Sequence, residues 1–274
     1  MIRDRVLRGE VAEAARVLAR LGLVTAFGHV SARAGDSMLI TPAADLAGVT
    51  AASVIEVPLA VRALPAGAPA EAWAHLALYR ARPDAAAIAR AQPAAAFAVA
   101  AVTTVMVPVH GQAAWLGESV PVYGDAALLR SADRAERAAS CLPAGEALLL
   151  RGNGALTLGA TPGLAVARMW LLAAACDVYL SALAASGASP VTTLSDGEIA
   201  SWRAVGGELL PRLWEHLRSG PGSAGPGSTG PGPGEEQGQG EPGDHRRPPA
   251  PRVMPLDLRE EREPHGGAPD REQT

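Results

Sequence analysis

The sequence of 274 residues contains no lysine, and all 24 of its basic residues are arginine. Schiff-base aldol chemistry, attachment of pyridoxal phosphate and the lysine-containing phosphate-binding loop all need a lysine amine. The absence of lysine therefore excludes these three classes of protein. The guanidinium groups that remain stay protonated at physiological pH.

Aromatic residues and cysteines are also scarce. Aromatic residues make up 4% of the chain and the apolar set 48%, so a core has to be built mainly from Ala, Leu and Val. Cys141 and Cys176 each lie alone in apolar surroundings, which favours small core residues over a disulfide or a metal pair. The formal net charge of -4, without a basic stripe, argues against nucleic acid as a partner.

The sequence shows no run of 18 apolar residues free of charge, and its charged, periodic N-terminus has no apolar signal core. We therefore expect a cytoplasmic protein without a membrane partner. Beyond residue 218 the composition changes to Pro, Gly and charged residues, which cannot build a packed core. This division predicts one domain over residues 1–218 and a disordered tail over 219–274.

Apolar periodicity and turn residues predict the order of elements in the domain. The expected helices cover residues 2–21, 71–82, 94–102, 127–142 and 161–185, with a further short helix within 191–217. The expected strands fall within residues 29–33, 38–41, 85–89, 103–109, 117–125, 148–150 and 155–158. The helix at 161–185 is apolar nearly all round, so we expect it to be buried in the core or between subunits.

The segment from Glu71 to Pro93 gathers an acid, a histidine and several arginines beside an abrupt turn. Glu71 and His75 are four residues apart on the predicted helix and should share a face. Arg90 and Gln92, two residues apart at the end of the next strand, should point into the same space. This segment is therefore the first candidate for a functional site.

The pattern E-x-x-x-H, a helix ending in Tyr-Arg-x-Arg-Pro-Asp, and a strand closing on two polar residues before proline resemble the class II aldolase/adducin family, in particular its L-fuculose-phosphate aldolases. LGLVTAFGHVSAR…MLITP at 21–42 and LLLRGNGALTLG at 148–159 agree in order and separation. The resemblance spans residues 1–190. It implies a three-layer α/β/α fold with a central, mainly antiparallel sheet flanked by helices, and homotetramers with sites at subunit boundaries.

The resemblance also implies a metal site, which this sequence has altered. Aldolases of the family bind a divalent metal through three histidines, and the metal stabilises enediolate oxygens. The matching positions here are Arg90, Gln92 and Asn153, and none of these is a good zinc ligand. We therefore expect no metal cofactor. The alternative is a divalent metal, zinc or manganese as in the family, held by His29, His75, His110 and Glu71.

The phosphate-binding positions of the family are altered as well. Small hydroxyl residues, glycine and two serines are replaced by Ala43, Ala44, Pro69 and Ala70, and His29 follows Gly28 where asparagine is common. These positions have lost hydrogen-bond donors or flexibility. A phosphorylated sugar is therefore not the expected substrate.

Glu71 occupies the acid/base position of the family, and His110 lies beside the position of the catalytic tyrosine and could replace it as a proton donor. Glu71 and Arg90 form either a structural ion pair in an inactive site, or an active pair in which Arg90 binds a substrate carboxylate or a developing enolate. The second interpretation names catalytic residues Glu71 and His110, and substrate-binding residues His29, Ser31, Arg90, Gln92 and Asn153.

Our leading hypothesis from the sequence is a carbon–carbon lyase, working by retro-aldol cleavage or decarboxylation on a small hydroxy- or oxo-carboxylate without the metal of the family. An arginine is a weaker electrophile than zinc, so the substrate needs a readily stabilised carbanion. The rival hypothesis is a catalytically inactive homologue that acts as a binding or assembly protein, as adducin does with this fold.

Overall fold

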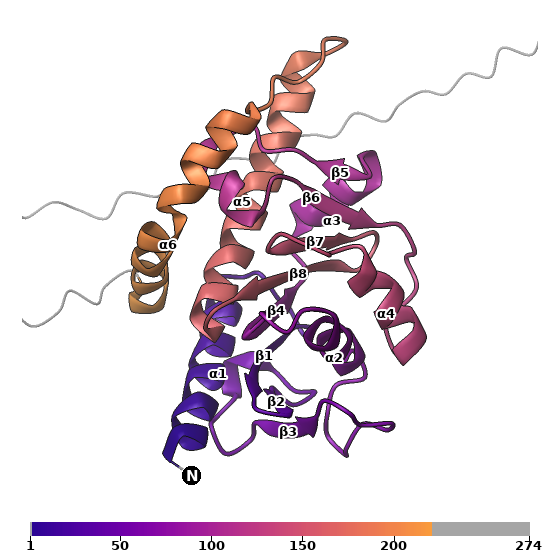
Figure 1. Ribbon diagram of the computed structural model, residues 1–274, viewed down its shortest axis with the longest axis vertical. Helices are drawn as coiled ribbons and strands as arrows, with labels where there is room; N and C mark the ends of the chain where they lie inside the picture. Colours follow the sequence, from indigo (N-terminus) through magenta and orange to yellow (C-terminus); the bar gives the residue numbers. More distant parts are fainter. Residues whose placement is uncertain (1, 221–274) are drawn as a thin grey trace, which may run out of the picture. The chain divides into compact units, whose positions relative to one another are not determined.

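The computed structural model describes residues 2–220, and the tail predicted at 219–274 lies almost entirely outside the described residues. Eight strands of the described part form one sheet in the order β3-β2-β1-β4-β8-β7-β6-β5 (Figure 1). Its neighbouring strands are antiparallel except for the parallel pair β6 and β7. The strands are β1 His29–Ala34, β2 Ser37–Ile40, β3 Ile55–Pro58, β4 Ala87–Ala91, β5 Val105–Met106, β6 Val120–Tyr123, β7 Ala147–Leu150 and β8 Gly154–Gly159.

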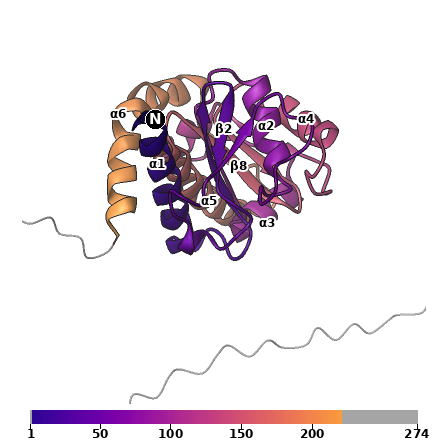
Figure 2. The same cartoon turned by 90° about the horizontal axis from the view of Figure 1, so that it is seen from below.

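Helices cover both faces of this sheet, which makes three layers (Figure 2). One face is packed by α1, α3 and α5, with α6 outside them, and the other face by α2 and α4. The helices are α1 Ile2–Arg20, α2 Ala72–Ala81, α3 Ala94–Val102, α4 Ala132–Ser140, α5 Pro162–Ser186 and α6 Asp196–Ser219, and the 3-10 helices are η1 Leu46–Gly48 and η2 Gly111–Leu116. The three-layer, mainly antiparallel α/β fold predicted from the sequence is confirmed.

Strand alternation divides the apolar residues between two cores. In β8, Leu156 and Leu158 belong to the core under α2 and α4, whereas Ala155 belongs to the core under α5. β4 turns only alanines toward the α5 side, at residues 87, 89 and 91. Their small side chains allow α5 to lie close to the centre of the sheet, with the Thr157 hydroxyl donating to the Ala165 carbonyl at 2.8 Å.

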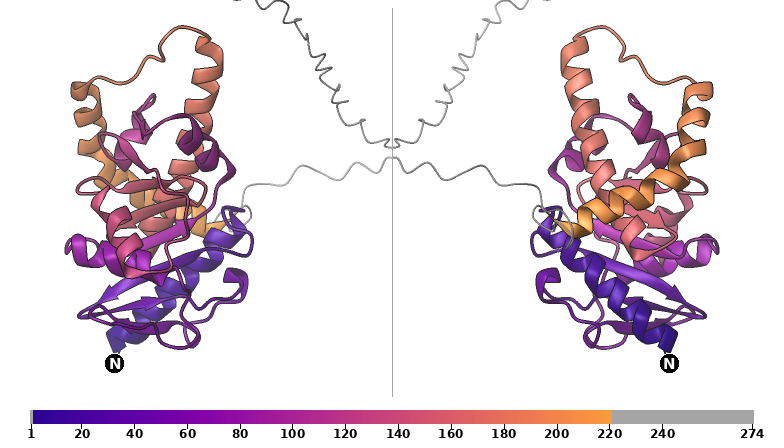
Figure 3. Two further views of the ribbon diagram at one scale, coloured as in Figure 1. Left: turned by 90° about the vertical axis from the view of Figure 1, so that its right-hand side faces the viewer. Right: turned by 90° about the vertical axis from the view of Figure 1, so that its left-hand side faces the viewer.

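The apolar helix α5 is partly buried within this chain, and the part of the expectation that places it between subunits stays a prediction. Ten of its 25 residues are buried, while Val178 and Leu183 near its C-terminal end are exposed. By length and composition α5 is the one helix of residues 2–220 that could span a membrane, but it packs on β4, β8, α1 and α3 as a core helix does. α6 lies alongside α5, and the segment that joins the two helices lies at the end of the domain opposite the start of α1 (Figure 3).

Three elements differ from the sequence-based expectation. The short helix expected within 191–217 is a 24-residue helix, begun by a capping box in which Ser195 and Glu198 satisfy each other's backbone N–H groups. The strand expected across 103–109 is only two residues long, Val105–Met106. β3, Ile55–Pro58, was not expected, because it is only four residues long and ends in proline, although its inward residues Ile55 and Val57 alternate with the exposed Glu56 and Pro58.

Candidate functional site

A cavity of about 620 Å³ lies between the turn before β1, the start of α2, the end of β4 and the loop from β6 to α4. Four of the predicted site residues line it, namely His29, Glu71, Arg90 and Gln92. The other lining residues are Ala26, Phe27, Gly28, Ala43, Ala44, Asp45, Pro69, Ala70, Leu128 and Arg130. Apart from its charged groups the wall is therefore mostly apolar or small.

Arg90 is a buried cation at the wall of this cavity. It stands on β4 directly opposite His29 of β1, and its side chain is among the largest buried ones, with 2% of the residue exposed. Its Nη2 donates to Oδ1 of Asn153 at 2.6 Å, and its Nε has no partner. No carboxylate of residues 2–220 lies within ion-pair distance of Arg90.

The burial of Arg90 lowers the pKa of its guanidinium, an effect opposed by the negative charge of Glu71 and increased by the positive charge of Arg130. An arginine pKa starts so high that the group stays charged at neutral pH despite such a shift. The site therefore keeps a fixed positive charge whose only direct side-chain partner among the described residues is a neutral amide.

Glu71 pairs with Arg130, so the structural ion pair between Glu71 and Arg90, one of the two alternatives from the sequence, is not formed. Its Oε1 accepts a hydrogen bond from Nε of Arg130 at 3.0 Å. Burial alone would raise the pKa of Glu71, but the hydrogen bond from Arg130 and the charges of Arg90 and Arg130 together hold that pKa below its ordinary value of 4.5. Glu71 is therefore ionised at neutral pH.

Arg130 and Leu128 are functional candidates that the sequence alone did not indicate. Both belong to the loop between β6 and α4, and Arg130 contacts Glu71 across 59 positions of the chain. The side chain of Arg130 is 57% exposed, so it forms an outer wall of the cavity. No periodicity marks a loop contact of this kind, and the only available signal was an arginine just before the helix start at Ser131.

Glu71 and His75, which are four residues apart in the sequence, have different surroundings. Glu71 is the N-cap residue of α2, with φ -77° and ψ 3°, and its side chain lies at the cavity. His75 is inside α2 and has no exposed surface.

His29, by contrast, reaches both the cavity and the buried interior. Burial, followed by the charge of Arg90, lowers the pKa of its imidazole to about 3, against a smaller opposing effect of Glu71. His29 is therefore neutral at physiological pH. Ser31, predicted to bind substrate, lies outside the cavity lining and is fully buried, with its hydroxyl 2.8 Å from both His75 Nδ1 and the Tyr79 hydroxyl.

The last two predicted site residues lie away from the cavity wall. Asn153 is buried behind Arg90 and positions its guanidinium rather than lining the cavity. His110 is the residue before η2, next to Trp202 of α6 through Gly111, and it is not among the residues that line the cavity of this chain. A direct role of His110 in proton transfer stays a prediction.

The side chains of this site do not fit the divalent metal that the family resemblance implies. Arg90 places a permanent cation beside His29 and His75, and both imidazoles are affected by its charge. No group of three His, Cys, Asp or Glu residues in the part of the chain described could hold a metal ion. In the part of the chain described, the site therefore presents a guanidinium and not a set of metal ligands.

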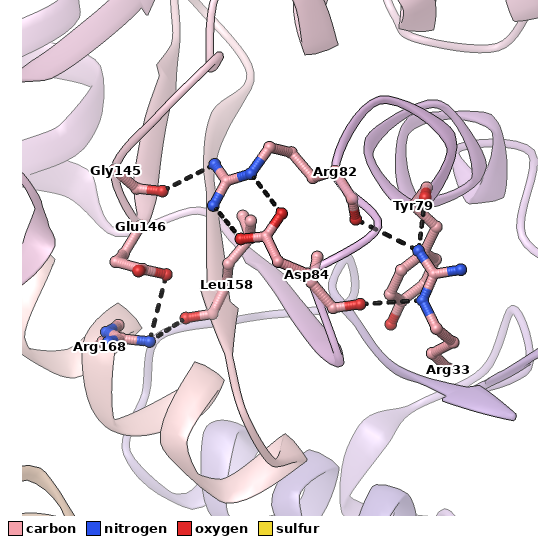
Figure 4. A network of polar contacts seen from close by, with 9 residues as sticks. Arg33, Tyr79, Arg82, Asp84, Gly145, Glu146, Leu158 and Arg168 are labelled. Atoms are coloured by element: carbon pink, nitrogen blue, oxygen red, sulfur yellow. Dashed lines mark hydrogen bonds and ion pairs between the residues drawn. The ribbon is translucent and has the colours of Figure 1, made fainter. Parts of the chain in front are cut away.

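A network of arginines fixes the α2 side of the site to the sheet (Figure 4). Arg33 of β1 donates from Nη2 to the carbonyls of Tyr79 and Arg82, and from Nε to the carbonyl of Ala85 at 3.0 Å. Its guanidinium carbon also lies 4.9 Å from the centre of the Tyr79 ring. Arg33 thus holds the C-terminal end of α2 against β1, which keeps the facing side chains of the two elements in register.

Gly154 sets the position of Asn153, and Gly154→Ala is expected to destabilise the protein. Gly154 has φ +86°, and a Cβ there would lie 2.2 Å from the carbonyl oxygen of Ala91. The left-handed conformation alone costs a side chain about 1–2 kcal/mol, and the backbone clash adds to it. Urea unfolding should therefore show a loss of at least this size.

The control for this prediction is Gly207→Ala. Gly207 is an exposed glycine inside α6, where a Cβ meets nothing within 4 Å. Alanine should stabilise a helix interior by about 0.5–1 kcal/mol relative to glycine. Equal unfolding free energies for the two variants would contradict the positional argument for Gly154.

Comparison with known proteins gives an independent view of this fold. The family model described as Class II Aldolase and Adducin N-terminal domain matches residues 9–180. Beta-adducin from Homo sapiens is 30% identical over 159 residues, which cover 56% of this chain and 22% of that protein. The chain therefore spans about a fifth of the length of this curated relative.

Solved structures agree with the match. The crystal structure of L-fuculose-1-phosphate aldolase from Thermus thermophilus superposes with a TM-score of 0.60 and 27% identity, covering 69% of this chain and 100% of that one. An aldolase II superfamily protein from Pseudomonas syringae gives a TM-score of 0.66 over 79% of this chain and 94% of its own, at 23% identity. The second similarity supports the fold alone.

Proposed function

The chain belongs to the class II aldolase and adducin family, and from this premise we propose that it is a carbon–carbon lyase acting on a small hydroxy- or oxo-carboxylate. The observation that carries the proposal is Arg90, a buried cation at the cavity without an ion-pair partner among residues 2–220. A buried charge without a counter-ion is costly, and a bound carboxylate would supply that counter-ion. Guanidinium and carboxylate match in shape and form charge-assisted hydrogen bonds.

Of the two cleavage reactions, the ionised state of Glu71 favours retro-aldol cleavage. In that reaction Glu71 takes the proton of the substrate hydroxyl, the carbon–carbon bond breaks, and the hydroxyl carbon becomes the carbonyl of the first product. The electron pair of the broken bond moves onto the neighbouring oxo group as an enolate. Glu71 then returns its proton to the enolate carbon, which releases the second product and restores the carboxylate.

The positive charge of Arg90 is the stabilising element for this enolate. It is fixed before the reaction begins, because Asn153 holds Nη2 and only 2% of the residue is exposed. The mostly apolar wall around it strengthens that electrostatic interaction. A 2-oxo acid, whose enolate is conjugated with a carbonyl, suits an electrophile weaker than a metal.

The second candidate function is a binding or assembly protein that has lost turnover. It is favoured by the 30% identity to beta-adducin and by Arg130, which donates a hydrogen bond to the carboxylate of Glu71. In this case the cavity would bind an anion but would not cleave it. The expected homotetramer and the cytoplasmic location stay predictions under both functions.

Titration with pyruvate, a small 2-oxo carboxylate, tests the proposal. We expect saturable thermal stabilisation, reaching about 2.7 kcal/mol when pyruvate is present at 100 times its Kd. Pyruvamide, which lacks the negative charge, should stabilise the protein far less. A lack of saturable stabilisation by pyruvate would remove the anion site and with it the proposed function.

Turnover separates the two candidate functions. Incubation with a series of 4-hydroxy-2-oxo acids should release pyruvate, detected by its reduction in a coupled assay. Saturable binding of pyruvate together with no cleavage across that series would favour the binding protein over the lyase. Glu71→Gln is the matched variant, because it keeps the shape of the side chain and removes the base.

A further inference from the structure

Two short patterns face each other across the buried side of the site. On β1 the residues His29, Ser31 and Arg33 alternate, so they lie on one face of the strand. On α2 His75 and Tyr79 are four residues apart and lie on one face of the helix. The two rows are matched in spacing, and Ser31 lies 2.8 Å from both helix side chains.

The direction of the hydrogen bonds in this row follows from what each group can donate. The Tyr79 hydroxyl is buried, and its one hydrogen-bond partner among the described residues is the hydroxyl of Ser31. If Ser31 donated to Tyr79, the tyrosine proton would have no acceptor, a loss of about 1–3 kcal/mol for a buried group. Tyr79 therefore donates to Ser31, and Ser31 donates to Nδ1 of His75.

The tautomer of His75 is set by this arrangement. Burial raises the pKa of Tyr79 and lowers that of His75 well below its ordinary value, so the phenol keeps its proton and the imidazole is neutral. A neutral imidazole that accepts at Nδ1 carries its proton on Nε2. Nε2 of His75 is buried and has no partner among the described residues.

The complementary atom lies on the neighbouring ring. Nδ1 of His29 is also buried and without a partner among residues 2–220, and the rings of His29 and His75 meet edge to face, with centres 6.0 Å apart. At this separation the two atoms are not hydrogen-bonded, and a short approach of the rings would join the donor of His75 to the acceptor of His29 and satisfy both. Nε2 of His29 is not sealed in this way, and His29 lines the cavity.

We propose that the chain Tyr79, Ser31 and His75 holds His29 in the tautomer with its proton on Nε2, so that His29 is a neutral hydrogen-bond donor to the oxygen that becomes the enolate. This inference rests on the proposed lyase function and adds a catalytic residue to it. Tyr79, Ser31 and His75 act through His29 and are positioning residues.

The placement of His29 also narrows the substrate class. His29 and Arg90 stand directly opposite each other on antiparallel strands, a relation that puts Cβ atoms about 4.5–5.5 Å apart. Two donors at that separation can bind a carboxylate oxygen and the oxygen of the adjacent carbon together. The pair is therefore suited to 2-oxo carboxylates, and less to carboxylates whose oxo group is further from the acid.

Nitrogen NMR of the protein labelled with 15N-histidine tests the tautomer directly. The chain has six histidines, and His29→Gln and His75→Gln assign the two signals of interest. We expect His29 to show a protonated Nε2 and an unprotonated Nδ1 between pH 6 and 8. Ser31→Ala removes the donor to Nδ1 of His75 and should produce a mixture of tautomers at His29, whereas His216→Gln, at an exposed position of α6, should change neither signal.

The outcomes are distinct from those of the pyruvate and turnover experiments. A proton on Nδ1 of His29, a protonated ring at neutral pH, or an unchanged tautomer in Ser31→Ala overturns the inference even if the lyase is active. If the tautomer is as expected and a substrate is cleaved, His29→Ala should lower kcat about 10²–10³-fold, with a smaller loss in His29→Gln, which retains an N–H donor. Equal kcat values for both variants and the unchanged protein would also overturn it.

Discussion

Arg90→Met is expected to abolish saturable binding of pyruvate and to lower kcat/KM for any substrate by at least about 10²-fold. Arg90 supplies the fixed positive charge at the cavity, and methionine replaces its stem but not its guanidinium. The same substitution should not destabilise the protein. Arg90 is 2% exposed and has no carboxylate partner among the described residues, so its removal relieves a buried charge.

The gain in stability is partly masked by Asn153. Its Oδ1 accepts the 2.6 Å hydrogen bond from Arg90, and leaving a buried acceptor unpaired costs about 1–3 kcal/mol. Arg90→Met/Asn153→Leu removes both partners and should show the full gain of about 1–4 kcal/mol in urea unfolding. Such an opposition between stability and function is typical of residues kept for binding.

Arg168→Met is the matched control for Arg90→Met. Arg168 is also largely buried, with 16% of its side chain exposed, but it forms an ion pair with Glu146 at 3.3 Å (Figure 4). Its loss leaves Glu146 without a counter-ion and should destabilise the protein while leaving pyruvate binding unchanged. If Arg90→Met destabilised the protein as Arg168→Met does and still bound pyruvate, Arg90 would be a structural residue.

Most elements of this fold were predictable because each has a strong local pattern. The apolar face of α1, the proline after Thr161 that starts α5 and the polar residues that end β4 are all visible in the sequence. The long helix α6 was underestimated because Pro211 and two glycines interrupt its pattern, and it is held instead by contacts with η2 and α5. Such contacts override local propensity and have no local signature.

The candidate site was predictable in part. The ends of α2 and β4 placed Glu71, Arg90 and Gln92 correctly at one cavity, because the ends of adjacent elements meet. An ion pair of Glu71 with Arg90 was one of the two alternatives from the sequence, and the partner in the structure is Arg130, because the loop from β6 folds over the cavity by tertiary contacts that leave no local pattern.

The buried row of Ser31, His75 and Tyr79 behind His29, in contrast, has a recognisable pattern in the sequence. The patterns H-x-S-x-R and H-x-x-x-Y place polar residues at strand and helix spacing, on elements that the sequence predicted correctly. The sequence did not indicate that the side chains of α2 contact those of β1. A polar row with the period of its own element, in an otherwise apolar segment, is thus a signal for a buried network.

Glu71→Gln is expected to lower kcat about 10²–10⁴-fold with little change in the binding of pyruvate, because glutamine fills the same space but cannot take a proton. The pH dependence of kcat/KM tests whether Glu71 is the base. Since the folded-state pKa of Glu71 is below 4.5, the base form is present at neutral pH, and kcat/KM should fall only as pH drops below that value. The stabilising effect of this carboxylate likewise is present above its unfolded pKa and is lost as pH falls through the folded one.

Arg130→Gln tests whether the fall of kcat/KM at low pH is caused by protonation of Glu71 or by a general effect of acid on the protein. Without the hydrogen bond and charge of Arg130, burial becomes the dominant influence and raises the pKa of Glu71, so the acid limb of kcat/KM should move to higher pH. Arg80→Gln is the control, because Arg80 forms an exposed pair with Glu136 away from the cavity lining and should leave the limb in place. An acid limb that stays unchanged in Arg130→Gln, or that persists in the residual activity of Glu71→Gln, would assign the titrating group to another residue and remove Glu71 as the base.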